Sequence, residues 1–367
     1  MRFRALSPGD SMPPAAFHQA DGQVMTTHAL GGAYLLICFI GTALPDPAMQ
    51  LVQKISRAFA ASAQLLFVWP GPPRAIDPGP RSVFDPERRA AIRFGAARLD
   101  APADAPCPAF LALFDPMSRL VAARHLLQDK DMDHILQALA QMPPPARCTG
   151  RPLQAPVLYL PRVFAPALCA RLIAGYHDGA RALTGVMRHI GGQTIGVHDP
   201  AFKRRRDYLV RDPALIATIQ ARIRAAVLPE LKKAFGFTAT RMERYLVGCY
   251  SAGDAGHFAP HRDNTTPATA HRRFAISINL NDDFEGGAVS FPEYGPDGFR
   301  APTGTAVVFG CGLMHAVAPV TQGARYAFLP FVYDEAGAKI RQACQTKPAQ
   351  KKTAPARGAV LNARVLP

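Results

Sequence analysis

Two histidines and one aspartate in the second half of the chain constrain its fold more than any other feature. The segment His257-Phe-Ala-Pro-His261-Arg-Asp263 places a histidine and a carboxylate two residues apart, and His315 follows much later. Side chains two residues apart lie on the same side of a β-strand, so His261 and Asp263 can converge on one ion from a strand and its turn. His315 must then come from a strand distant in sequence and adjacent in space. Two imidazoles and a carboxylate on one face of a metal ion leave other positions open, as in non-haem Fe(II) oxygenases.

Short apolar runs in the same half of the chain predict a β-rich domain. Residues 274–280, 305–309 and 327–333 are rich in β-branched and aromatic side chains, which is typical of strands. The Gly286-Gly287 pair and residues 302–304 supply turns between them. Short strands with such turns are typical of a jelly roll, or double-stranded β-helix. We therefore expect a jelly-roll domain over residues 156–335.

Two helices are predicted before the strands of this domain. Residues 164–174 and 212–224 carry apolar side chains at helical spacing. Asp212 is suited to the N-cap of the second helix, with Pro213 at its first position. Such helices can brace one sheet and leave the other face open for substrate.

Arg325 lies shortly after His315, in Thr321-Gln-Gly-Ala-Arg325-Tyr326. A planar guanidinium offers paired donors to a carboxylate, so this residue can bind the far carboxylate of a dicarboxylic acid whose other end chelates the metal. A structural ion pair with a carboxylate of the protein is the alternative.

Further motifs follow one another in a fixed order from Tyr250 onward. They are Tyr250-x-x-Gly253, His261-Arg-Asp263, Leu280-Asn281, Phe284-Glu-Gly-Gly287, Phe291-Pro-Glu293, Gly304-Thr-Ala-Val-Val-Phe309, His315 and Pro319-Val-Thr-x-Gly-x-Arg325-Tyr326. As an ordered set, they resemble the catalytic domain of the prolyl 4-hydroxylase-like Fe(II)/2-oxoglutarate dioxygenases.

The resemblance implies a role for five residues. It assigns Fe(II) to His261, Asp263 and His315, and it assigns the distal carboxylate of 2-oxoglutarate to Arg325. Tyr250 would either donate a hydrogen bond to 2-oxoglutarate or pack in the core. The chain departs from the family in two ways: prolyl hydroxylases often have lysine at the position of Arg325, and the stretch from Tyr250 to His261 is slightly long.

The activity implied by the resemblance is hydroxylation of a C–H bond with dioxygen, accompanied by conversion of 2-oxoglutarate to succinate and carbon dioxide. Ascorbate would keep the iron reduced. The substrate is expected to be a protein or peptide side chain or a small molecule, selected by residues 185–211 and 264–273. The alternatives are a nucleic-acid-directed oxidative demethylase, and a thiol peroxidase or binding protein centred on the first domain.

Basic residues give the chain a formal net charge of +15, but their distribution argues against nucleic acid as the partner. Much of the excess lies in residues 336–367, where basic residues occur without acidic ones; this segment is predicted to be disordered and to attract polyanions weakly. The cluster Lys203-Arg-Arg-Arg206 is interpreted as a solvated edge between strands, with an entrance for an acidic substrate as the alternative. Residues 271–273 are interpreted as a solvated loop, and His257 as a satisfied side chain rather than a fourth ligand.

The first 145 residues predict a separate α/β domain. Strands are expected at 33–40, 64–69, 108–114 and 119–122, and helices at 46–60 and 131–141. With Gly9-Asp-Ser-Met-Pro13 at its start, this region resembles a thioredoxin-fold domain of the peroxiredoxin type, in which Pro108 would be the cis-proline. A proline-rich linker over residues 146–155 follows it.

The chemistry expected of a peroxiredoxin is missing from this first domain. Peroxiredoxins place a reactive thiolate at a helix start, yet Leu44-Pro-Asp-Pro-Ala-Met49 contains no cysteine. Cys38 falls within a predicted strand and is interpreted as structural. The domain is therefore predicted to be redox-inactive and to serve substrate capture, partner docking or oligomerisation.

Cysteine usage and hydropathy favour a cytoplasmic protein. The seven cysteines form no CxxC pair, the longest apolar run is strand-sized, and no secretory signal is evident at the start of the sequence. No membrane partner is expected.

Overall fold

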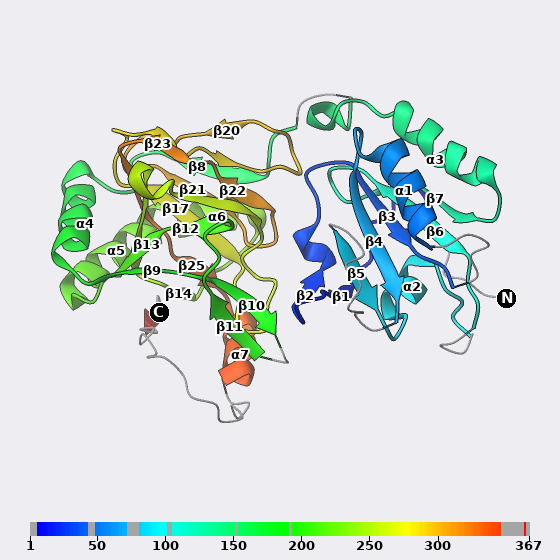
Figure 1. Cartoon of the computed structure of the whole chain (residues 1–367). Coiled ribbons are helices and arrows are strands. Elements are labelled where there is room, and N and C mark those ends of the chain that lie inside the picture. The colour runs from blue at the N-terminus through cyan, green and yellow to red at the C-terminus, as the bar shows by residue number, and fades with distance from the viewer. Residues whose placement is uncertain are drawn as a thin grey trace. The chain divides into compact units, whose positions relative to one another are not determined.

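The computed structural model describes residues 6–42, 48–71, 81–100, 105–150, 153–190, 193–345 and 363–364 (Figure 1). The chain divides into two compact units. The first comprises residues 1–155 together with His189–Gln193 and Phe291–Pro296, and the second comprises the remainder.

The first unit is built on one mixed seven-stranded sheet in the order β2-β1-β5-β4-β3-β6-β7. Strand β4 runs parallel to β3 and β5, whereas β6 runs antiparallel to β3 and β7. Its elements in chain order are β1 (Ala16–His18), β2 (Val24–Thr26), η1 (Thr27–Ala29), β3 (Leu35–Phe39), α1 (Ala48–Phe59), β4 (Gln64–Pro70), β5 (Ser82–Asp85), α2 (Arg89–Phe94), β6 (Ala109–Phe114), β7 (Leu120–Leu126), α3 (Asp129–Ala140) and η2 (Pro145–Arg147).

Helices cover both faces of this sheet. All five residues of β3 are buried, and their side chains alternate between the two faces. Leu36 and Cys38 share a core with α1 and α3, whereas Ile37 and Phe39 share a second core with α2. The expected strands and helices of this region are thus confirmed within the described residues, with boundaries shifted by a few positions.

Two details of the expected first domain need comment. No cis peptide bond occurs among the described residues, so the expectation of a cis bond before Pro108 is wrong. In this segment, the Thr42 N–H donates a hydrogen bond to the Cys107 oxygen, and the Thr42 hydroxyl accepts one from the Cys107 N–H. Of the segment 44–49, which corresponds to the peroxidatic position and contains no cysteine, residues 44–47 lie outside the described residues.

The second unit is a double-stranded β-helix flanked by helices. A five-stranded sheet has the order β12-β16-β22-β19-β20, and a larger sheet follows the path β26-β14-β25-β17-β24-β15-β13-β9, with β21 and β8 joined to β17. Every strand pair in the two sheets is antiparallel. Two separate pairs complete the strands, namely β18-β23 and β10-β11, and the end of β10 and the start of β11 belong to the first unit.

The elements of the second unit are bounded as follows: β8 (Val157–Leu160), α4 (Pro166–Asp178), β9 (Arg181–Leu183), β10 (Val186–Ile190), β11 (Gln193–Val197), β12 (Lys203–Arg204), β13 (Arg206–Leu209), α5 (Pro213–Ala226), α6 (Leu228–Phe235), β14 (Arg241–Glu243), β15 (Leu246–Ser251), η3 (Ala252–Asp254), β16 (His257–His261), β17 (Phe274–Asn279), β18 (Glu285–Gly286), β19 (Val289–Ser290), β20 (Gly298–Phe299), β21 (Ala306–Gly310), β22 (His315–Val317), β23 (Val320–Gln322), β24 (Ala324–Phe328), β25 (Phe331–Tyr333), α7 (Glu335–Gln345) and β26 (Ala363–Arg364).

Helices α4, α5 and α6 pack against the larger sheet. Leu172, Ile219 and Leu231 from these helices share one core with Ile276 of β17 and Phe328 of β24. Helix α5 begins as predicted, because the Asp212 side chain accepts a hydrogen bond from the Ala214 N–H and Pro213 occupies the first turn. The helices therefore brace the larger sheet and leave the smaller one to carry part of the site.

Two expectations about the second unit are corrected. The single strand expected over 327–333 is two strands, β24 and β25, because Pro330 has no N–H with which to continue the ladder. The disorder expected from residue 336 is wrong for helix α7, where Arg341 donates a hydrogen bond to the Tyr333 hydroxyl and pairs with Glu243. Residues 346–362 and 365–367 lie outside the described residues. No helix in the described part of the chain is both long and apolar enough to cross a membrane.

Candidate active site

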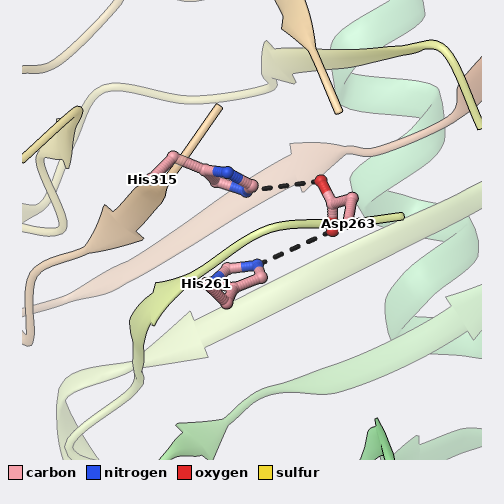
Figure 2. A group of neighbouring side chains, drawn as sticks. All are labelled: His261, Asp263 and His315. Atoms are coloured by element: carbon pink, nitrogen blue, oxygen red, sulfur yellow. Dashed lines mark ion pairs between the residues drawn. The ribbon is translucent and has the colours of Figure 1, made fainter. Parts of the chain in front are cut away.

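His261, Asp263 and His315 come together at one edge of the smaller sheet. His261 ends β16, Asp263 follows it, and His315 begins β22, where it is the register partner of His261. The Nε2 atoms of His261 and His315 lie 3.7 and 3.3 Å from the carboxylate of Asp263, and Figure 2 shows both rings directed toward it. One ligand atom from each residue can be chosen so that all lie within 4.8 Å of one another. The convergence expected from the spacing is therefore present.

Backbone contacts fix the orientation of both imidazoles. Nδ1 of His261 lies 2.8 Å from the Ala259 oxygen, and Nδ1 of His315 lies 3.1 Å from the Leu313 oxygen. Nδ1 is the donor in these contacts, so the Nε2 lone pairs are left to face the carboxylate. Such backbone acceptors are the usual outer-sphere partners of metal-bound histidines.

His257, on the same strand, is arranged differently. Its Nδ1 lies 2.8 Å from the Ala255 oxygen, and its Nε2 lies 3.1 Å from the Ala201 oxygen. Both ring nitrogens therefore already face backbone acceptors, which fits the interpretation of His257 as a satisfied side chain.

The charge states of the cluster suit a divalent metal. Burial and the neighbouring His315 lower the pKa of His261 to about 3, so this imidazole stays neutral. Burial raises the pKa of Asp263, but His315, His261 and Arg272 outweigh it, and the pKa is lowered overall. Two imidazole Nε2 atoms and one carboxylate, facing one another, fit Fe(II) at this position.

Arg325 supplies a buried cation on the larger sheet. It lies on β24 and is 2% exposed. Its Nε donates to Oδ1 of Asn279 at 3.0 Å, and Nη2 donates to Oγ of Ser277 at 3.2 Å, but Nη1 has no hydrogen-bond partner among the described residues. The alternative of a structural ion pair is not observed, because these partners are neutral. A buried guanidinium with an unused donor fits the carboxylate of 2-oxoglutarate, which would compensate its charge.

Tyr250 lies next to Arg325. The two residues are register partners in β15 and β24, and Cζ of Arg325 is 5.4 Å from the Tyr250 ring centroid. Nη1 of Arg205 donates to the Tyr250 hydroxyl at 3.2 Å, so the hydroxyl hydrogen remains free to be donated elsewhere. Tyr250 is buried, as expected of a core residue, and it also lies beside the candidate 2-oxoglutarate site at Arg325.

Two of the three residues expected to form a solvated loop at 271–273, His271 and Arg272, belong instead to a buried ion cluster, whereas Arg273 is about one-third exposed. Glu243 on β14 is surrounded by His271 at 3.1 Å, Arg272 at 2.8 Å and Arg341 at 3.0 Å. Arg272 also donates to the backbone oxygen of Asp263 at 3.4 Å. The solvated interpretation is wrong for His271 and Arg272 because Glu243 provides their buried countercharge, which sequence spacing alone does not reveal.

The interpretation of residues 203–206 as a solvated edge is also wrong in part. Lys203 and Arg205 are buried, whereas Arg204 and Arg206 are exposed, as expected when side chains alternate along extended backbone. Arg205 forms two hydrogen bonds with Asp207, at 2.6 and 2.8 Å. The sequence carries both signals, because buried and exposed positions alternate and Asp207 lies two residues after Arg205.

A family model for the 2OG-Fe(II) oxygenase superfamily matches residues 245–333, which contain the three candidate metal ligands, Tyr250 and Arg325. Residues 245–333 form a 2-oxoglutarate–Fe(II) oxygenase domain. The chain is therefore a 2-oxoglutarate-dependent dioxygenase that uses Fe(II) and 2-oxoglutarate.

Curated relatives of the oxygenase domain are named as hydroxylases. The chain is 27% identical over 163 residues to the PKHD-type hydroxylase azo0608 of Azoarcus sp. (strain BH72), a match that covers 42% of this chain and 70% of that protein. It is 27% identical over 94 residues to a PKHD-type hydroxylase of Synechococcus sp. (strain JA-2-3B'a(2-13)), covering 24% of this chain and 41% of the relative.

Among solved structures, a prolyl hydroxylase from Trichoplax adhaerens, in complex with a peptide fragment of the hypoxia inducible factor oxygen degradation domain, is similar to part of the chain. The identity is 14% and the TM-score is 0.43, with 52% of this chain and 87% of that chain covered.

Proposed function

We propose that the chain hydroxylates a C–H bond of a protein or peptide side chain or of a small molecule, and that His261, Asp263 and His315 hold the iron for this reaction. The observation that carries the proposal is the convergence of the two Nε2 atoms on the Asp263 carboxylate, with each Nδ1 held by a backbone oxygen. Facial ligation by these residues would leave positions on the metal for the cosubstrate and dioxygen.

Arg325 would anchor the distal carboxylate of 2-oxoglutarate. Its Nη1 has no partner among the described residues, while Asn279 and Ser277 hold the rest of the guanidinium in place. Tyr250 would donate its hydroxyl hydrogen to the same ligand, since Arg205 already donates to the hydroxyl oxygen. A fixed guanidinium loses little entropy when the carboxylate binds.

Bound iron would supply the activation of dioxygen that removes hydrogen from an unactivated carbon. The net reaction would convert substrate, dioxygen and 2-oxoglutarate into hydroxylated substrate, succinate and carbon dioxide, with one oxygen atom entering each of the first two products. The protein would orient the substrate carbon and exclude water, and ascorbate would keep the iron reduced. Substrate selection would fall to residues 185–211 and 264–273.

The hydroxylase names of the curated relatives support hydroxylation over oxidative demethylation of nucleic acid. Lys203 and Arg205 are buried, so only two of the four residues in the basic cluster 203–206 are exposed to a nucleic acid, as the demethylase alternative would require. Because this argues against a nucleic-acid substrate, the proposed substrate is a peptide, a protein or a small molecule.

Residues 1–145 would form a redox-inactive domain of the thioredoxin type, used for substrate capture, docking or oligomerisation. Burial raises the pKa of the Cys38 thiol, so the thiolate needed for peroxide attack is disfavoured. The iron-free full-length protein should consume hydrogen peroxide no faster than the iron-free C38S variant. Peroxide turnover that depends on Cys38 or Cys107 would contradict this assignment.

The test of the hydroxylase is succinate release by the full-length protein supplied with Fe(II), 2-oxoglutarate and dioxygen, combined with mass spectrometry for the gain of one oxygen in a substrate library. Succinate release should require iron and disappear in H261A. Substitution of His257, whose ring nitrogens face backbone oxygens, serves as the matched control. Absence of iron-dependent succinate release in the wild-type protein would refute the proposal.

A further inference from the structure

Three basic side chains surround the carboxylate of Asp207 close to the candidate metal site. Arg205 forms two short hydrogen bonds with it, at 2.6 and 2.8 Å. Arg244 approaches the same carboxylate only at 3.4 Å. Lys203 makes its hydrogen bonds to neutral groups, the Thr184 hydroxyl at 2.9 Å and the Gly185 oxygen at 3.1 Å. Arg205 alone neutralises Asp207, so Arg244 is a surplus positive charge, and Lys203 adds a second one whenever its amine is protonated.

The two other carboxylates near these cations are already engaged. Asp263 belongs to the proposed iron site. Glu243 is surrounded by His271, Arg272 and Arg341. Iron(II) and doubly charged 2-oxoglutarate would cancel each other's charge, so loading the site would leave the surplus in place.

Arg244 is held in an uncommon backbone conformation that keeps its side chain at this position. Its φ of 64° lies in the left-handed region, which costs energy for a residue with a Cβ. Its guanidinium carbon lies 5.5 Å from the Phe331 ring centroid, and 25% of its side chain remains exposed. The long contact with Asp207 leaves most of its five N–H donors available to a ligand.

Lys203 approaches the metal site through an aromatic ring. Its Nζ lies 5.1 Å from the centroid of Phe258, and Phe258 stacks on His261 with ring centroids 3.5 Å apart. Burial, followed by the positive charge of Arg205, lowers the pKa of Lys203 to about 6. An ammonium group in this position lacks a countercharge, and an anion bound beside it would supply one.

We propose that Arg244 and Lys203 form a subsite for an oxyanion of the substrate, so that the enzyme acts on an acid, either a carboxylate or a phosphate ester, with the reacting carbon near the anionic group. The inference rests on the proposed hydroxylase function and adds the class of its substrate. The planar guanidinium would bind the oxyanion through paired donors, and the ammonium would act as a second point charge.

The test measures binding of three probes to the full-length protein loaded with Fe(II) and saturating 2-oxoglutarate in the absence of dioxygen. Benzoate and phenyl phosphate carry the two candidate anions, and benzamide is the neutral analogue of benzoate. Saturating 2-oxoglutarate keeps the probes away from Arg325. Calorimetry should detect binding of at least one anion and no comparable binding of benzamide, and the anion that binds more tightly identifies the substrate class.

Variants distinguish the subsite from direct binding to iron. R244Q should weaken anion binding by about tenfold or more, equivalent to about 1.4 kcal/mol, and R244K should restore part of it. R206Q is the matched control, because Arg206 belongs to the same basic cluster but is exposed and pairs with Asp254 at 3.1 Å. It should change the affinity by less than about twofold.

A second measurement needs no variant. Binding of benzoate or phenyl phosphate should raise the pKa of Lys203 in the wild-type protein, followed through the NMR chemical shift of its Cε as the pH is changed. Equal binding of benzamide, absence of anion binding, or equal losses in R206Q and R244Q would each overturn the subsite. Succinate release without anion binding would refute the subsite alone, whereas anion binding without iron-dependent succinate release would refute the hydroxylase.

Discussion

Tyr250 covers one side of Arg325, because the two residues are register partners in β15 and β24 and the guanidinium carbon lies 5.4 Å from the tyrosine ring. The tyrosine hydroxyl also accepts a hydrogen bond from Arg205. Tyr250 therefore contacts both Arg205, which is already paired with Asp207, and Arg325, which has no carboxylate partner among the described residues. A bound carboxylate should therefore stabilise the charge of Arg325 more than that of Arg205, because Arg205 already has a carboxylate partner.

Replacing Arg325 should weaken 2-oxoglutarate binding without removing the metal ligands. R325Q is expected to lose roughly 10- to 100-fold in affinity, since a hydrogen bond to a charged group contributes about 1.5–3 kcal/mol. R325K should lose less affinity, because lysine keeps the positive charge although it lacks the paired N–H donors of a guanidinium. Anaerobic calorimetry with Fe(II)-loaded protein measures both, and R206Q is the control. Unchanged 2-oxoglutarate affinity in R325Q would exclude Arg325 as the anchor.

Removal of a proposed iron ligand should abolish tight metal binding. We expect H315A to lose more than about 100-fold in Fe(II) affinity, since substitutions of outer-sphere partners alone cost about 10- to 100-fold. H257A should bind the metal normally, because both ring nitrogens of His257 already face backbone oxygens. Metal content after dialysis against a graded chelator distinguishes the two variants. Equal metal loss in both would mean that the assigned ligand set is incorrect.

Arg272 should act as a positioning residue for Asp263. Its side chain joins Glu243 to the backbone oxygen of Asp263, so R272M should weaken metal binding by about tenfold while the three ligands remain. R273M is the matched control, because Arg273 is about one-third exposed and donates to the Ala270 oxygen. Metal titration with a spectroscopic Co(II) probe would also report altered ligand geometry. An unperturbed Co(II) spectrum and affinity in R272M would assign Arg272 a purely structural role.

Glu243 should make the stability of the second unit depend on acid pH. His271, Arg272 and Arg341 outweigh the effect of burial and lower the pKa of Glu243 to about 2, from an ordinary value of 4.5. The pKa of Glu243 is lower in the folded state than in the unfolded state. Ionised Glu243 therefore stabilises the fold fully above the unfolded-state pKa, and this stabilisation is lost as the pH falls toward about 2. This contribution is of the order of 3 kcal/mol or less.

Hydrogen exchange of the β14 and β25 amides in the metal-free protein measures this effect. Between pH 5 and pH 2, the free energy of opening should fall further in the wild-type protein than in E243Q, for which this ionisation is absent. Parallel pH profiles for the two proteins would show that Glu243 does not titrate with a lowered pKa.

The sequence was sufficient to predict the parts of the site that depend on local spacing. His261 and Asp263 are two residues apart at a strand end, and the apolar run before Gly310 forms β21 within one residue of its expected bounds. Asp212 caps α5 as its side-chain chemistry required. In each case, the signal and the structure lie within a few residues of each other.

The buried charges whose partners are distant in the chain could not be predicted in the same way. Arg272 is buried because Glu243, on another strand, accepts its hydrogen bond. Arg205 is one of four consecutive basic residues, and its partner Tyr250 lies on β15, 45 residues later. Nothing in the local composition separates Arg272 from exposed arginines such as Arg206.

Helix α7 has a practical consequence for shortening the chain. Arg341 contributes one of the cations around Glu243, and Glu243 in turn holds the arginine that contacts the backbone of Asp263. A fragment that ends at residue 333, where the family match stops, would lack this helix. The buried carboxylate of Glu243 would then lose one of its cationic partners. Any minimal catalytic fragment should therefore extend at least to residue 345, even though the last proposed cosubstrate contact lies twenty residues earlier.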